Sequence, residues 1–184
     1  MLYLLFFGSG ASALIYEVVW VRVFANVFGN TIYSASIVTA VFMLGLGIGS
    51  LTAGRLADRR YVMLAPSERQ RVEGLHVFAS LEFAIGVLGL GISMLLPHLG
   101  DLSASVSSYT RGADGWYVLS FGSYAARTLI ALVLLTPITL LMGATLTVLI
   151  RHVGHAPSLE LSSSIAWLYG VNTLGAALGC FLTD

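Results

Sequence analysis

The sequence predicts an all-α fold, a polytopic bundle of about five transmembrane helices. Of the 184 residues, 57% are hydrophobic and only 10% are charged, whereas a soluble domain carries about 25% charged residues. The apolar residues also gather in five stretches, each near the ~20 residues that a helix needs to cross the hydrocarbon of a bilayer. A soluble chain of this composition would aggregate, because it could not cover its surface with polar groups.

The apolar stretches define the expected elements in order. The first begins at the N-terminus without a basic segment and continues past any cleavage site, so we interpret it as a retained helix rather than a signal peptide. Pro97 is expected to close the third stretch, because proline interrupts the helical hydrogen-bond ladder. The predicted spans form one transmembrane domain over residues 1–184 and cover residues 2–28, 32–56, 75–96, 123–150 and 162–182.

The arginines predict the orientation of these spans. Five of the nine basic residues lie between positions 55 and 73, and Arg151 begins the connection between the fourth and fifth spans, whereas residues 98–117 hold only Arg111. Basic residues are retained on the cytoplasmic side. We therefore expect a cytoplasmic N-terminus, an external loop over residues 98–117 and an external C-terminus. The chain still resembles a helix end at Asp184, which favours a fragment of a longer protein.

Composition also excludes several classes of function. The formal net charge is zero, so nucleic acid is not an expected partner. Cys180 is the sole cysteine, which rules out an internal disulfide and a cysteine metal cluster. His152 and His155 lie on a short connection, and a metal site there would need further ligands. We predict no metal site, and the sequence identifies no cofactor.

Glycines recur in two of the spans. Gly45 and Gly49 in the second span, and Gly175 and Gly179 in the fifth, each form a Gly-x-x-x-Gly motif that is followed by Leu-x-Asp. Such motifs are first of all helix-packing surfaces. The echo also suggests an internal repeat of three spans with inverted topology, as in transporter folds, in which case a sixth span is missing.

Several sequence strings occur together in order. They are GASALIYEVVWVR at residues 10–22, FMLGLGIGS at 42–50, GRLADR at 54–59, LMGATL at 141–146 and YGVNTLGA at 169–176. The chain thereby resembles the membrane region of the fused major-facilitator/spermidine-synthase-like proteins of bacteria, over nearly its whole length except the external loop. The resemblance implies part of a major-facilitator-like half in the bacterial inner membrane and a connection with polyamines.

The same resemblance bears on two details. Asp58 and Arg59 form a cytoplasmic loop motif that resembles the loop between the second and third helices of major facilitator transporters, where an Asp-Arg pair lies at the cytoplasmic end of the second helix. The Gly-Arg-Arg that usually follows is absent. In the resembling proteins a soluble aminopropyltransferase-like domain commonly follows the membrane part. No strand, Gly-rich loop and helix of that kind occurs in this sequence. We therefore expect no catalytic residues and no catalytic activity in this chain.

Charged residues within the spans are candidates for an intramembrane polar site. Glu17, Glu82 and Arg127 each cost about 2.5–3.5 kcal/mol on insertion scales, so they are expected to face the interior, reach the interface or pair. From their depths we predict that Glu17 and Arg127 lie near each other. Asn172 is a further candidate. These residues form either a polar site or proton path, or a structural ion pair that sets helix register.

Two functions remain open. In the first, the chain is the membrane domain of a spermidine-synthase-like or transporter-like protein that anchors a catalytic domain or binds a small polar or cationic solute. In the second, it is a non-catalytic structural subunit of a larger membrane complex. The expected partners are the lipid bilayer, other membrane protein subunits and such a solute.

Overall fold

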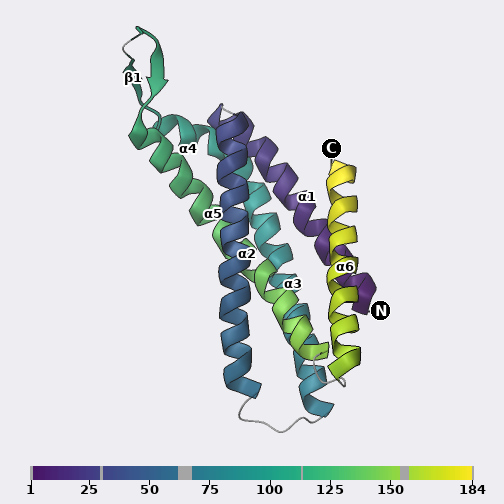
Figure 1. The fold of residues 1–184 in the computed structure, drawn as a ribbon. Coiled ribbons are helices and arrows are strands. Elements are labelled where there is room, and N and C mark those ends of the chain that lie inside the picture. The colour runs from purple at the N-terminus through teal and green to yellow at the C-terminus, as the bar shows by residue number, and fades with distance from the viewer. Residues whose placement is uncertain (1, 30, 62–67, 113, 154–157, 184) are drawn as a thin grey trace.

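The computed structural model describes residues 2–29, 31–61, 68–112, 114–153 and 158–183. Five long helices dominate this part of the chain (Figure 1). Each contains a stretch long and apolar enough to cross a membrane, by length and composition, which confirms the expected all-α class. The helices are α1 (Leu2–Phe28), α2 (Thr31–Tyr61), α3 (Glu68–Leu95), α5 (Phe121–Val153) and α6 (Ser158–Thr183).

The connections have more structure than the sequence suggested. The expected external loop contains the 3₁₀ turn η1 (Leu96–His98), the short helix α4 (Leu99–Ser105) and an antiparallel hairpin of β1 (Tyr109–Arg111) and β2 (Tyr117–Leu119). Pro97 lies in the 3₁₀ turn, so α3 ends just before it. Gly29, after α1, has a φ of 73°, a left-handed conformation that suits glycine in the turn to α2.

The helices also extend beyond the expected spans. Asp58 and Arg59 lie inside α2, which continues to Tyr61, so their placement in a loop was wrong. Leucine, alanine and arginine are good helix formers, and they allow α2 to continue past the apolar stretch. Hydropathy finds the part of a helix that lipid could cover, not the point at which its hydrogen bonds end.

The helices pack in a definite pattern. The chain reverses direction at each connection, so its two ends lie at opposite ends of the bundle (Figure 1). The most extensive contacts join α2 to α5 and α1 to α6, and α3 packs on α5. α1 also contacts α2, whereas α6 has little contact with α5. α6 is therefore held chiefly by α1.

Two buried clusters fill the bundle. The larger joins α1, α2, α3 and α5, with Trp20, Phe24, Phe42 and Leu135 among its largest side chains. The smaller lies nearer the beginning of α1 and contains Phe6, Phe78, Leu149 and Leu168. Leu168 brings α6 into this second cluster, which connects it to α3 and α5. Burial of each large apolar side chain contributes about 1.5–3 kcal/mol in water, and less against lipid.

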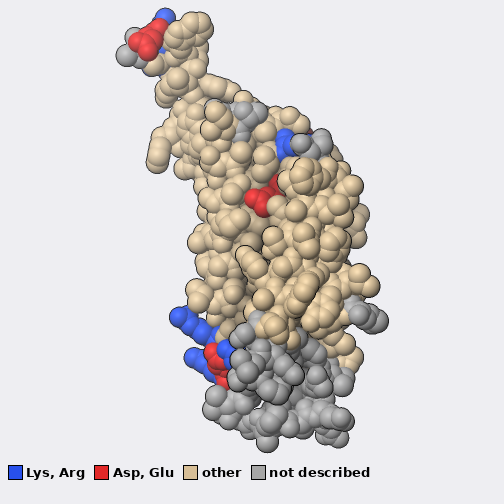
Figure 2. Space-filling model, turned by 45° about the vertical axis from the view of Figure 1, so that its right-hand side comes forward, with Lys and Arg blue, Asp and Glu red and all other residues tan. Residues whose placement is uncertain are grey.

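The outer surface is predominantly uncharged. On the face shown in Figure 2, charged atoms gather at the tip of the hairpin and near the opposite end of the bundle, with only isolated ones between. Large apolar side chains such as Leu90, Leu129 and Phe181 are exposed. This distribution suits helices that are surrounded by lipid along most of their length.

Candidate functional site

Glycines bring the backbones of α2 and α5 into direct contact. A Cβ atom added to Gly49 would lie 2.0 Å from the carbonyl oxygen of Leu140, and one added to Gly45 would lie 1.9 Å from Thr139 Oγ1. The contact is mutual, because a Cβ on Gly143 of α5 would lie 2.2 Å from the carbonyl oxygen of Leu46. At these three glycine positions there is no room for a side chain.

The contact between α1 and α6 is built in the same way. A Cβ on Gly175 would lie 2.1 Å from the Phe7 carbonyl oxygen, and one on Gly179 would lie 2.3 Å from that of Ala11. Gly10 of α1 faces Asn172, whose carbonyl oxygen is 2.2 Å and whose Oδ1 is 2.7 Å from the added Cβ. Asn172 therefore lies at this helix–helix contact. Gly10 and Gly143 were not singled out from the sequence, although each precedes a small residue in an apolar span.

Glu82 of α3 is bound to α1. The Ser9 hydroxyl donates a hydrogen bond of 2.6 Å to Glu82 Oε1, and both residues are partly buried. About two helical turns further along each helix, the hydroxyl of Tyr16 lies against Gly89. Sequence reasoning did not identify Ser9, because an isolated serine in an apolar span carries no distinguishing signal.

Glu17 faces a different neighbour. It is partly buried, and the hydroxyl of Thr39 on α2 lies within hydrogen-bonding reach of its carboxyl group. Thr39 itself is exposed. Glu17 therefore lies toward the outer side of the α1–α2 contact, whereas Glu82 lies between α1 and α3.

Arg127 has partners other than the one expected. Its Nη1 donates to the Phe28 carbonyl oxygen at 2.7 Å, its Nη2 donates to Ser107 Oγ at 2.8 Å, and its guanidinium carbon lies 5.5 Å from the centroid of the Phe28 ring. Glu17 precedes Phe28 by eleven residues, about 16 Å along a helix. The expected proximity of Glu17 and Arg127 was therefore wrong. The error came from depth, since Arg127 lies in the second turn of α5, level with the end of α1.

The bonds of Arg127 have a clear structural effect. The Phe28 carbonyl belongs to the last turn of α1, where carbonyl groups lack helical partners and the helix dipole is negative. Arg127 is buried and satisfies one of these carbonyls from α5. Its Nε is buried without a hydrogen-bond partner. This arginine joins the end of α1 to the start of α5.

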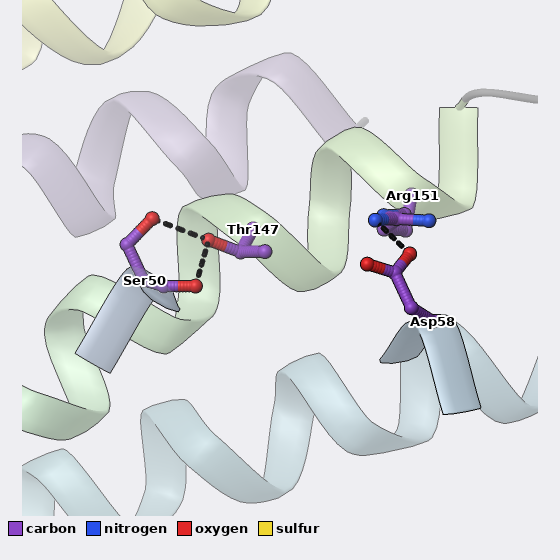
Figure 3. A network of polar contacts seen from close by, with 4 residues as sticks. All are labelled: Ser50, Asp58, Thr147 and Arg151. Carbon is purple, nitrogen blue, oxygen red and sulfur yellow. Dashed lines mark hydrogen bonds and ion pairs between the residues drawn. The ribbon is translucent and has the colours of Figure 1, made fainter. Parts of the chain in front are cut away.

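Polar contacts also join α2 to α5 toward the end of each helix (Figure 3). The hydroxyls of Ser50 and Thr147 are 2.8 Å apart, and Asp58 forms an ion pair with Arg151. The side chains of Asp58 and Arg151 are 55% and 39% exposed, so water reaches the pair. Arg59 is exposed beside it. The sequence indicated Asp58 but not its partner on α5.

The candidate residues do not form one cluster. Glu17 lies on α1 and faces α2, whereas Glu82 on α3 and Asn172 on α6 each face α1 at different places. Arg127 lies near the far end of the bundle. No group of three His, Cys, Asp or Glu residues that could hold a metal ion occurs in the described ranges. His155 lies outside the described residues. The structure therefore offers separate polar contacts around α1 and no assembled catalytic centre in these ranges.

Comparison with known proteins gives one informative similarity. The chain is 26% identical, over 183 residues, to polyamine aminopropyltransferase 1 of Streptomyces coelicolor. The match covers 98% of this chain but 28% of that protein, so this chain spans less than a third of its relative's length. No protein-family model and no solved structure matches the chain. The chain is thus distantly similar to part of a polyamine aminopropyltransferase.

Proposed function

We propose that this chain is the membrane-embedded region of a spermidine-synthase-like protein of the bacterial inner membrane. It anchors a catalytic domain or binds a small polar or cationic solute, with a polyamine as the first candidate. The observation that carries the proposal is that the match covers nearly all of this chain but only part of its relative. Nearly all of a chain made of apolar helices aligns with 28% of an aminopropyltransferase.

The fold supports a separation of membrane embedding, in this chain, from catalysis, in the rest of such a protein. Strands in the described ranges are limited to the two-stranded hairpin. A nucleotide-like cosubstrate is commonly bound by a parallel sheet with a Gly-rich loop at a helix N-terminus, and no such unit occurs in these ranges. Aminopropyl transfer would therefore take place in another part of the protein, next to the membrane.

Charge supports an orientation for this region. Exposed Arg55 and Arg59 lie near the end of α2, close to the ion pair of Asp58 and Arg151. Basic residues favour the cytoplasmic side. This end of the bundle then faces the cytoplasm, and the hairpin faces outward.

The carboxyl groups of Glu17 and Glu82 support binding of a cation. Each is partly buried and has a hydroxyl neighbour from another helix, Thr39 or Ser9. Ser9 and Glu17 are eight residues apart on α1, about 12 Å along its axis. Because the two carboxyl groups face different helices, each is a separate candidate for binding an ammonium group.

Spermidine binding by the purified protein in proteoliposomes tests the solute-binding part. We expect saturable binding that falls about tenfold, a loss of about 1.4 kcal/mol, in Glu17→Gln and in Glu82→Gln. Asp101→Asn on the exposed surface of α4 is the matched control and should leave binding unchanged. Absence of binding by the parent protein would reject a polyamine site and leave anchoring as the remaining function.

Fractionation of the full-length protein tests anchoring. We expect aminopropyltransferase activity in the membrane fraction, and we expect it to move to the soluble fraction when the five helices are deleted. Activity that stays with the membrane after this deletion would reject an anchoring role. An alkaline phosphatase fusion at residue 112 in the hairpin tests the proposed orientation, since the fusion is active only outside the cytoplasm.

A second candidate is a non-catalytic subunit of a larger membrane complex. It is favoured by α6, which packs chiefly on α1 and leaves Trp167, Leu174 and Phe181 exposed. Purification in a mild detergent separates the two candidates. Fixed stoichiometry with other subunits, together with unchanged solute binding in Glu82→Gln, would favour the complex.

A further inference from the structure

The hairpin of β1 and β2 presents an unusual set of exposed side chains. It projects past the ends of the long helices at the edge of the bundle (Figure 1). Tyr109, Trp116 and Tyr117 are 62%, 78% and 73% exposed. Val118 beside them and Phe121 at the start of α5 are also exposed. We call these five side chains the hairpin surface.

The hairpin is fixed to the helices at its base. Ser123 of α5 is buried, and its hydroxyl accepts a hydrogen bond of 2.7 Å from the Ser108 backbone N–H. The Ser120 N–H donates to the Ser108 carbonyl oxygen at 2.9 Å, and Arg127 holds Ser107. An isolated two-stranded hairpin is marginally stable in water. These serine contacts therefore hold the hairpin surface in one position relative to α4 and α5.

The chemistry of this surface fits the headgroup layer of a bilayer. Tyrosine and tryptophan are enriched at membrane–water interfaces, because their rings are apolar and their N–H or O–H groups remain hydrated. The charged residues toward the tip, Arg111 and Asp114, cancel, which leaves no net charge to attract a charged macromolecule. Three residues per strand reach about 10 Å, similar to the 5–8 Å or so of headgroup layer on each side of the hydrocarbon.

We propose that the hairpin surface lies in the headgroup layer of the membrane and anchors the α4–α5 end of the bundle there. The hairpin projects at the edge of the bundle rather than over the other helices (Figure 1), a position that would bring it to the surrounding lipid. Lipid contact would remove from water five large side chains that the protein itself leaves uncovered. The proposal rests on the membrane embedding proposed above and adds a specific lipid contact.

Fluorescence of Trp116 in proteoliposomes tests the contact. The variant Trp167→Phe retains Trp116 and the buried Trp20, and Trp116→Phe is the matched control that retains Trp20 and Trp167. We expect lipids brominated near the headgroup to remove most of the Trp116 emission, lipids brominated near the chain ends to remove little, and aqueous acrylamide to remove little. Strong quenching by acrylamide without quenching by shallow brominated lipid would overturn the proposal and place the hairpin in water.

A second probe avoids dependence on the tryptophan variants. A nitroxide is attached at Val118→Cys in a Cys180→Ser background, with Leu129→Cys on the exposed face of α5 as the comparison. We expect Leu129 to report hydrocarbon depth and Val118 to report the headgroup layer. A Val118 label that is immobile and inaccessible to both oxygen and a water-soluble nickel reagent would indicate contact with a second copy of this chain and would also overturn the proposal.

These outcomes are separate from failure of the membrane embedding itself. If the helices do not cross a bilayer, the protein will not float with the vesicles and the label at Leu129 will be accessible from water. If only the lipid contact is wrong, the protein floats with the vesicles and the label at position 129 lies at hydrocarbon depth. The label at position 118 and the fluorescence of Trp116 then indicate water or protein around the hairpin.

Discussion

The α2–α5 and α1–α6 helix pairs both pack closely through glycines, but they differ in the side-chain contacts that accompany this packing. In the α1–α6 pair, both glycines of the Gly-x-x-x-Gly motif lie against carbonyl oxygens of α1. In the α2–α5 pair, Gly49 lies against the Leu140 carbonyl oxygen and Gly45 against the Thr139 hydroxyl. The α2–α5 pair adds the Ser50–Thr147 contact, the Asp58–Arg151 ion pair and a hydrogen bond from the Tyr33 hydroxyl to the Tyr124 carbonyl oxygen. In the α1–α6 pair, close packing is accompanied by Asn172 at Gly10.

The two pairs are also related by their order in the chain. α2 is the second helix of a first set of three and packs on α5, the first helix of the next set. α6 is the second helix of that next set and packs on α1. The glycines of the second helix in each set thus pack against the first helix of the other set. An inverted repeat would produce this reciprocal packing. The α2–α5 pair is also joined by side-chain hydrogen bonds and an ion pair.

The largest effect is expected from Gly49→Leu in α2. Its side chain would meet the backbone of Leu140, which cannot move without displacing α5, so we expect a loss of about 1–3 kcal/mol in the free energy of unfolding. Unfolding in mixed detergent micelles, followed by circular dichroism, measures it. Gly47→Leu is the control on the same helix, because nothing lies within 4 Å of the Cβ position there. Equal losses in both variants would contradict the packing argument.

Gly179→Leu in α6 should have a more local effect. Its side chain would meet the Ala11 carbonyl oxygen, but α6 has few other contacts to transmit the displacement. We expect faster hydrogen exchange in α6 and little change in α2 and α5, measured by mass spectrometry. Gly170→Leu, where the Cβ position is open, should exchange like the parent. Loss of protection throughout the bundle would show that α6 is not peripheral.

A smaller loss of stability is expected when the hydroxyl contact between α2 and α5 is removed. Replacing Ser50 by Ala or Thr147 by Val should cost about 0.6 kcal/mol, the average for a hydrogen bond between membrane helices. The double variant should cost less than the sum, because both changes remove the same contact. Thr173→Val on α6, whose hydroxyl bonds to Tyr169 of its own helix, is the control. Additive losses would mean that the two hydroxyls stabilise the protein separately.

The smallest effect is expected at the ion pair of Asp58 and Arg151. Both side chains are partly exposed, so water and salt screen the pair, and a double-mutant cycle of Asp58→Asn and Arg151→Gln should give about 0.2–1 kcal/mol. The coupling should decrease in high salt. Arg55→Gln, on the exposed side of α2, is the control for a change in net charge. A coupling that does not respond to salt would indicate a pair more shielded than its exposure suggests.

Several particular features could be predicted from the sequence, and others could not. The spans followed from apolar length, and the end of α3 followed from Pro97. The glycine motifs indicated close packing but not the partner helix. Arg127 was recognised as costly in lipid, yet its bonds to Phe28 and Ser107 depend on how α1 ends and how α4 folds back. Ser9 became notable only because α3 places Glu82 opposite it.

The sequence by itself determined that five helices are long and apolar enough to cross a membrane, because length and hydropathy are properties of each segment alone. It also determined where helices could approach closely, because glycine removes the side chain wherever it falls. Only the tertiary structure decided that α2 meets α5 and α1 meets α6, and that Glu17, Glu82 and Arg127 lie apart. Those outcomes depend on rotation and depth of one helix against another, and an apolar surface is compatible with many such arrangements until backbone contacts and buried polar groups select one.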